Sequence, residues 1–168
     1  MSKLKWILIL LNLLLLLVYF NCSVLNKEKI LSDGTLILLK LAPVDPRSLM
    51  QGDYMRLNYE LTNGHISSGK LKKRGYCIVE LDSAGVGQLK RFQSDRKGVE
   101  ADEYMIEYNL NDWDINIGAE SYFFQEGNAK YFENAEYGGL RVDSKGNSVL
   151  VGLYDEDRKL ITPPDVKQ

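Results

Sequence analysis

Residues 52–61 read GDYMRLNYEL, and from Asp53 onward polar and apolar side chains alternate. An alternation with a period of two residues is typical of a β-strand that buries one face. The pattern therefore predicts a strand over residues 53–61 and assigns its two faces. Met55, Leu57, Tyr59 and Leu61 are expected to face the core, and Tyr54, Arg56, Asn58 and Glu60 to face away from it.

Short segments of similar character recur along the chain. Two turn sequences, residues 83–87 and 143–147, contain glycine and separate pairs of such segments, which predicts two β-hairpins. A short helix is expected over residues 128–136, capped by Asn128. The fold class that follows is mainly β: an antiparallel barrel or a sandwich-like domain with one short helix. The predicted strands are 35–41, 53–61, 74–82, 88–93, 104–111, 113–124, 140–142 and 149–154.

Residues 4–25 are predominantly apolar. At a rise of about 1.5 Å per residue, a helix of this length crosses the hydrocarbon core of a bilayer, which is about 30 Å thick. The segment therefore predicts a single transmembrane helix that contacts the lipid bilayer. A cleaved signal peptide, or a chain lipidated at Cys22, is the alternative, although the small residues that precede a cleavage site are missing before Cys22.

The predicted organisation has four parts. Residues 1–25 form the anchor, residues 26–34 a polar linker, residues 35–161 the β-rich domain and residues 162–168 a loose tail. Lysines flank both ends of the apolar segment, so the charge rule is nearly balanced. Because only a very short tail precedes the apolar segment, we expect a single-pass protein of the cytoplasmic membrane with its domain on the extracytoplasmic side.

Composition excludes several classes of function. The chain has 168 residues, with 21 Lys and Arg against 23 Asp and Glu, so its net charge of −2 argues against nucleic acid as a partner. One His and two Cys are too few for a zinc site built from those residues, and the sequence has no glycine-rich phosphate loop. We therefore expect neither a metal nor a cofactor, and no residue can be assigned as catalytic.

The candidate binding residues cluster around the opening stretch. Asp53, Tyr54 and Arg56 lie where a strand begins after Gly52, whose freedom would permit a tight entry or a bulge. This region is interpreted either as a structural corner that fixes the strand register or as a polar face turned toward a ligand. Tyr122 and Glu126 complete the set of candidate binding residues.

The same stretch resembles a known protein family. Gly52, Asp53, Tyr54, Leu57 and Tyr59 match every fixed position of the motif that names the GDYXXLXY family, and residues 122–127 (YFFQEG) resemble a second segment of that family. The resemblance covers about residues 35–155. It implies a bacterial protein anchored in the membrane, and it supplies no activity and no catalytic residue.

Two hypotheses about function remain open from the sequence. The first is a non-enzymatic binding module of the cell envelope that contacts another membrane protein, such as a multi-span one, through Asp53, Tyr54, Arg56 and the helix. The second is an envelope hydrolase or carbohydrate-binding enzyme that uses the carboxylates of Asp53, Glu120 and Glu126.

Overall fold

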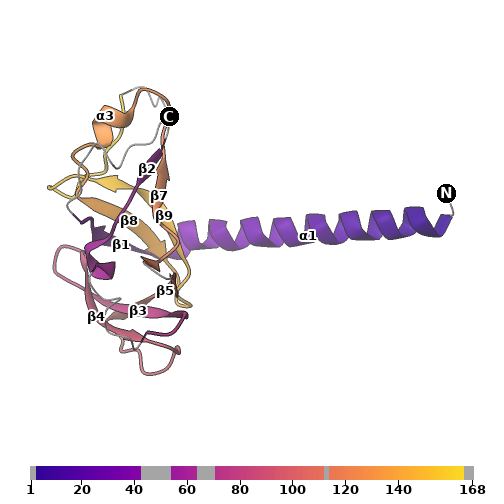
Figure 1. The fold of residues 1–168 in the computed structure, drawn as a ribbon, viewed down its shortest axis with the longest axis horizontal. Helices are drawn as coiled ribbons and strands as arrows, with labels where there is room; N and C mark the ends of the chain where they lie inside the picture. Colours follow the sequence, from indigo (N-terminus) through magenta and orange to yellow (C-terminus); the bar gives the residue numbers. More distant parts are fainter. Residues whose placement is uncertain (1–2, 43–53, 64–70, 112–113, 165–168) are drawn as a thin grey trace.

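The computed structural model describes residues 3–42, 54–63, 71–111 and 114–164. It consists of one long N-terminal helix and a β-domain that extends across the helix axis (Figure 1). The elements are α1 (Lys3–Asp33), β1 (Thr35–Lys40), β2 (Tyr54–Arg56), the 3₁₀-helix η1 (Glu60–Thr62), β3 (Arg74–Leu81), β4 (Gly87–Gln93), β5 (Glu103–Leu110), β6 (Ile115–Asn116), β7 (Ser121–Phe123), α3 (Ala129–Phe132), β8 (Tyr137–Val142) and β9 (Ser148–Tyr154).

The strands form three antiparallel sheets. One sheet has the order β1-β8-β9, the second pairs β2 with β7, and the third has the order β4-β3-β5-β6. Within the described ranges these sheets do not close into a barrel, so the sandwich-like alternative is the correct one. The mainly β fold, the short helix and the long apolar N-terminal helix are confirmed.

The two faces predicted for residues 54–61 are confirmed. Met55, Leu57 and Tyr59 are at most 2% exposed and join one hydrophobic cluster with residues of all three sheets. However, the strand ends at Arg56, and residues 60–62 form a 3₁₀ turn instead of continuing it. The reason is that the chain changes partners, since the Leu57 amide bonds to Glu120 while Tyr59 forms an isolated bridge with Leu41, directly after β1.

Two other element boundaries differ from the prediction. Residues 115–123 form two short strands, β6 and β7, instead of one long strand, because the chain turns at Gly118, which has a φ of +80°. The short helix covers only Ala129–Phe132. Asn128 stands at its N-cap but has helical dihedral angles, and its side chain makes no capping hydrogen bond, so that part of the prediction is wrong.

Both predicted hairpin turns are present and share one construction. In each turn an aspartate, Asp82 or Asp143, accepts a hydrogen bond from the backbone amide of the residue four positions later. The distance between the amide nitrogen and the carboxylate oxygen is 2.9 Å in both turns. A glycine with positive φ stands three positions after the aspartate, at Gly85 and Gly146. Residues 155–159 repeat this turn with an arginine, Arg158, in the glycine position at a φ of 61°.

Helix α1 joins the β-domain without a break. It extends through residues 26–33, where a polar linker was expected, and ends against the sheet formed by β1, β8 and β9. Ile30 is 8% exposed there, and the Arg141 guanidinium donates a hydrogen bond of 2.7 Å to the Gly34 carbonyl. The apolar part of α1 is long enough to cross a membrane, and none of it is buried in the protein.

Candidate functional site

The ribbon formed by β2 and β7 holds most of the described candidate residues. Its register pairs Tyr54 with Phe123, Met55 with Tyr122, and Arg56 with Ser121. Because side chains alternate across a strand, the pair of Met55 and Tyr122 lies on the core face. We call the opposite side, which carries Tyr54, Arg56, Ser121 and Phe123, the outer ribbon face.

The outer ribbon face presents an aromatic pair beside a cation. The ring centroids of Tyr54 and Phe123 are 5.6 Å apart, and Phe123 is 72% exposed. Arg56 is exposed and lies 3.8 Å from the carboxylate of Asp114. An exposed ion pair of this kind contributes little to stability, so Arg56 can exchange it for another anion at low cost.

Tyr122 belongs to the other side of the ribbon. Its ring meets Phe132 of α3 edge to face, with centroids 5.1 Å apart, and burial raises the pKa of its phenol. The structure therefore brings Tyr54 and Arg56 together on one surface and separates Tyr122 from them. Glu126 is exposed on the segment between β7 and α3, while Gly52 and Asp53 lie outside the described residues.

The second half of the motif fixes the ribbon to the core. The Leu57 amide donates to the Glu120 carbonyl at 2.8 Å, and the buried Tyr59 hydroxyl donates to the Ala119 carbonyl at 2.7 Å. Burial, together with the nearby charge of Glu120, raises the pKa of Tyr59. Leu57 and Tyr59 therefore attach the ribbon to the hydrophobic core, in which both side chains are buried.

Glu120 is occupied by the turn in which it lies. Its carboxylate accepts the Ile117 amide hydrogen, and burial is the main cause that raises the pKa of this carboxyl group. Neither Glu120 nor Glu126 lines either of the two grooves described next. Among the described residues, no three His, Cys, Asp or Glu side chains are placed to hold a metal ion.

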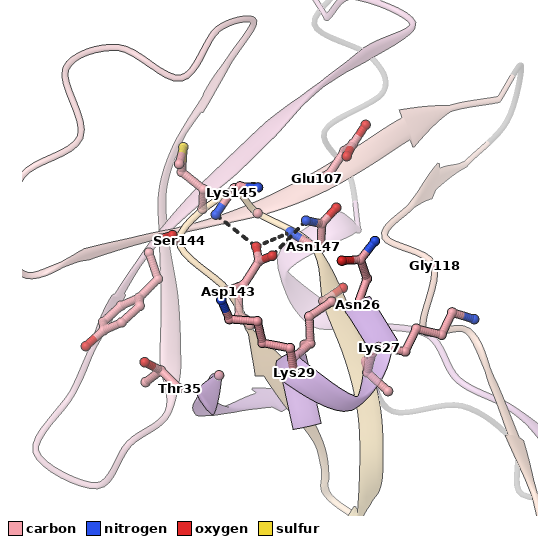
Figure 2. Close-up of a pocket in the computed structure, with 18 of the residues that line it drawn as sticks. Asn26, Lys27, Lys29, Thr35, Glu107, Gly118, Asp143, Ser144, Lys145 and Asn147 are labelled. Atoms are coloured by element: carbon pink, nitrogen blue, oxygen red, sulfur yellow. Dashed lines mark hydrogen bonds between the residues drawn. The ribbon is translucent and has the colours of Figure 1, made fainter. Parts of the chain in front are cut away.

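The larger groove, of about 1020 Å³, lies where α1 meets the β-domain (Figure 2), and we call it the juxtamembrane groove. Sequence reasoning missed it because its parts are distant in the chain: the last turns of α1, the edge of β5 and the β8–β9 turn. Its polar lining includes Asn26, Lys27, Lys29, Glu107, Lys145 and Asn147. The lysines that follow the apolar segment were the one signal of it in the sequence.

The second groove, of about 730 Å³, adjoins the ribbon, and Arg56 is part of its wall. Five carboxylates and two cations line it. Both cations already have partners, since Lys40 lies 3.4 Å from Glu60 and Arg56 lies near Asp114. We call it the acidic groove. Its carboxylates are those of Glu133, Glu136, Asp155, Glu156 and Asp157.

Comparison with known proteins identifies one family. The sequence model of the GDYXXLXY protein family matches residues 16–153, which include the second half of α1 and nearly all of the β-domain. No curated protein and no solved structure matches the chain. The match covers most of the sequence, and this chain is therefore a member of the GDYXXLXY protein family.

Proposed function

We propose that this protein is a non-enzymatic binding module, anchored by α1, whose partner is another integral membrane protein. The observation that carries the proposal is the outer ribbon face, where Phe123 is 72% exposed and packs beside Tyr54. Large aromatic side chains and arginine are enriched at protein interfaces and dominate binding energy there. Exposing a phenylalanine to water without such a partner gives the fold no stability.

The acidic groove indicates which chemistry the partner carries. It adjoins Arg56 and the ribbon and has a surplus of carboxylates. Electrostatic complementarity favours a partner loop with basic side chains, and an apolar or aromatic residue of that loop would rest on Phe123. Such a surplus also speeds association with a basic loop at low ionic strength.

The form of the anchor supports a partner within the same membrane. Because α1 continues as a helix to Asp33 and docks through Ile30, the ribbon is held at a fixed height above the bilayer. Asn12 lies within the apolar segment, where an amide is costly unless it bonds to a neighbouring helix. We place the domain on the extracytoplasmic side of a bacterial membrane, with the anchor retained.

Site-specific photo-crosslinking in native membranes tests the proposal. A photoreactive residue at Ser121 of the full-length chain should capture an integral membrane protein with a basic loop on the same side of the bilayer. The product should disappear when Phe123→Ala or the pair Glu133→Lys and Glu136→Lys is added. The same probe at Gln88 on β4, remote from the ribbon, is the control. A product that survives both sets of substitutions contradicts the proposal.

A labelling experiment tests the orientation separately. Gln88→Cys places an exposed thiol on β4, and a reagent that cannot cross membranes should modify it in cells whose cytoplasmic membrane is intact but whose outer barrier is permeable. Labelling only after the cytoplasmic membrane is opened would place the domain on the cytoplasmic side.

A further inference from the structure

The juxtamembrane groove combines an apolar interior with a charged rim. Ile30 of α1, Met105 of β5, Ile117 and Val149 supply apolar surface inside it. Lys27 and Lys29 extend from α1 toward opposite ends of the groove, and Glu107 belongs to the facing strand (Figure 2). Its volume of about 1020 Å³ is at the upper end of the range of about 300–1,000 Å³ typical of small-molecule pockets.

The groove lies at the depth of lipid headgroups when α1 spans a bilayer. If residues 4–25 occupy the hydrocarbon core, residues 26–29 continue for about 6 Å beyond it. The headgroup layer is about 5–8 Å thick on each side of the membrane. Ser23, Asn26, Lys27 and Lys29, which belong to the helical wall of the groove, are therefore within or next to that layer.

Some charged groups of the rim have hydrogen-bond or ion-pair partners within the protein, and others have none among the described residues. The Asp143 carboxylate is bonded within its turn, including a bond of 2.7 Å from the Asn147 amide group. Buried Glu103 is bonded to Arg91. By contrast, the side chains of Lys27, Lys29 and Glu107 make no hydrogen bond or ion pair with the described residues. Lys145, a third cation of the lining, has no ion pair among the described residues either and lies near the Asp143 carboxylate. The groove thus offers three cations and one half-buried anion, Glu107, to a ligand.

We propose that the juxtamembrane groove seats the headgroup of a phospholipid from the leaflet at which α1 emerges. The ammonium groups of Lys27 and Lys29 attract the negatively charged phosphate from the two ends of the groove. The Glu107 carboxylate accepts a hydrogen bond from an amine or a hydroxyl of the headgroup, and the apolar interior receives the glycerol end of the lipid. The site therefore selects phosphatidylethanolamine and phosphatidylglycerol over phosphatidylcholine, whose headgroup has no hydrogen-bond donor.

Native mass spectrometry of the full-length chain in detergent measures this selection. With each lipid added in turn, phosphatidylethanolamine and phosphatidylglycerol should be retained about tenfold more than phosphatidylcholine, because a bond to a charged acceptor is worth about that factor. The comparison of phosphatidylethanolamine with phosphatidylcholine is decisive, since both headgroups have zero net charge. Equal retention of these two lipids overturns the proposal.

Matched variants assign the effect to the groove. Lys27→Gln with Lys29→Gln should lower the retention of every phospholipid at least about tenfold, and Glu107→Val should remove only the preference over phosphatidylcholine. The controls are Lys72→Gln with Lys97→Gln, and Glu133→Val, all outside the groove. If the control lysines have the same effect as Lys27 and Lys29, binding is general surface attraction and the proposal is wrong.

A crosslinking measurement that needs no variant completes the test. A phosphatidylethanolamine with a photoreactive headgroup should label peptides from β5 and from the β8–β9 turn, in addition to α1. Labelling confined to α1 would mean that lipids only surround the helix, and it would contradict a groove-bound headgroup. Because the outer ribbon face is not involved, these results are independent of the protein partner proposed above.

Discussion

The ring of Tyr59 lies directly against the α-carbon of Gly138 on β8. A side-chain carbon added at Gly138 would be 2.9 Å from both Cε1 and the hydroxyl oxygen of Tyr59. The same hydroxyl is bonded to the Ala119 carbonyl, so the ring cannot move away without breaking this bond. The last residue of the GDYXXLXY motif therefore joins β8 to the segment that leads into β7.

This contact predicts the effect of a single methyl group. Gly138→Ala should destabilise the domain by about 1–3 kcal/mol, as overpacking of a buried site does. In a Tyr59→Leu background, where the ring is gone, the same substitution should cost clearly less. Chemical denaturation of the native chain, the two single variants and the double variant gives the coupling free energy between positions 59 and 138. Equal costs in both backgrounds would show that the ring does not constrain position 138.

The turn at residues 155–159 predicts a stabilising substitution. Arg158 has a φ of 61° in a turn that has glycine at the corresponding place twice elsewhere in the chain. Arg158→Gly should raise the free energy of unfolding by about 0.5–1 kcal/mol, because relief of the left-handed strain exceeds the entropy that glycine adds to the unfolded chain.

Gly85→Ala is the matched control for that substitution. Gly85 has a φ of +79°, and an added Cβ there would meet no atom within 4 Å. The control changes only the backbone preference, so it should lower the melting temperature while Arg158→Gly raises it. A lower melting temperature for Arg158→Gly would refute the equivalence of the two turns.

The ion pair of Glu103 and Arg91 predicts a dependence of stability on pH. The pKa of Glu103 is lowered from 4.5 to about 2. The main cause is the hydrogen bond from the Arg91 guanidinium, and the second is the hydrogen bond from the Glu100 amide. A carboxyl group whose pKa is lower in the folded state stabilises the fold above pH 4.5, and this contribution is lost as the pH falls toward 2. Glu103→Gln should therefore reduce stability at neutral pH and flatten its decline between pH 4.5 and 2.

Denaturant midpoints measured across this pH range check the expectation. Glu60→Gln is the control, because Glu60 is paired with Lys40 at an exposed position, 3.4 Å away, and belongs to a different ion pair. It should leave the shape of the acid decline almost unchanged. An unchanged acid decline in the Glu103 variant would show that this ion pair does not contribute to the pH dependence.

The two cysteines should differ sharply in reactivity. Both are free, with Cys22 exposed on α1 and Cys77 buried on β3, where burial raises the pKa of its thiol to about 12. Cys22 lies within the apolar segment, one turn from its end, so a membrane-permeant maleimide should reach it in detergent micelles. Since the thiolate is the reactive form, the same reagent should leave Cys77 intact until the domain unfolds. Mass analysis of the labelled chain checks this, and rapid modification of Cys77 in the folded protein would contradict its burial.

Local patterns predicted much of this fold. Alternation assigned the inner and outer faces of residues 54–61, and the Asp and Gly residues of two turns located both hairpins. The third turn, residues 155–159, was not predicted because Arg158 stands where glycine is expected. The separation of Tyr122 from Tyr54 also escaped, since it depends on the pairing of strands more than 60 residues apart, which no local pattern specifies.

The junction between helix and domain shows the same limit. Residues 26–33 carry no apolar periodicity beyond Ile30 and Leu31, so the sequence suggested a linker. Their helical form is stabilised by the preceding helix and by tertiary contacts, namely the burial of Ile30 and the bond from Arg141 to Gly34. The juxtamembrane groove exists only because of this docking and was therefore outside the reach of sequence reasoning.

One distance measurement tests most directly whether a retained, continuous helix holds the β-domain at the membrane. Spin labels on the native Cys22 and on Gln88→Cys of the full-length chain in lipid nanodiscs should give one narrow distance distribution by electron–electron double resonance. Replacing Ile30 with Ala should broaden it, and replacing the exposed Leu31 with Ala should not. A broad distribution in the native chain, or a mature protein that lacks a free thiol at residue 22, would contradict the account.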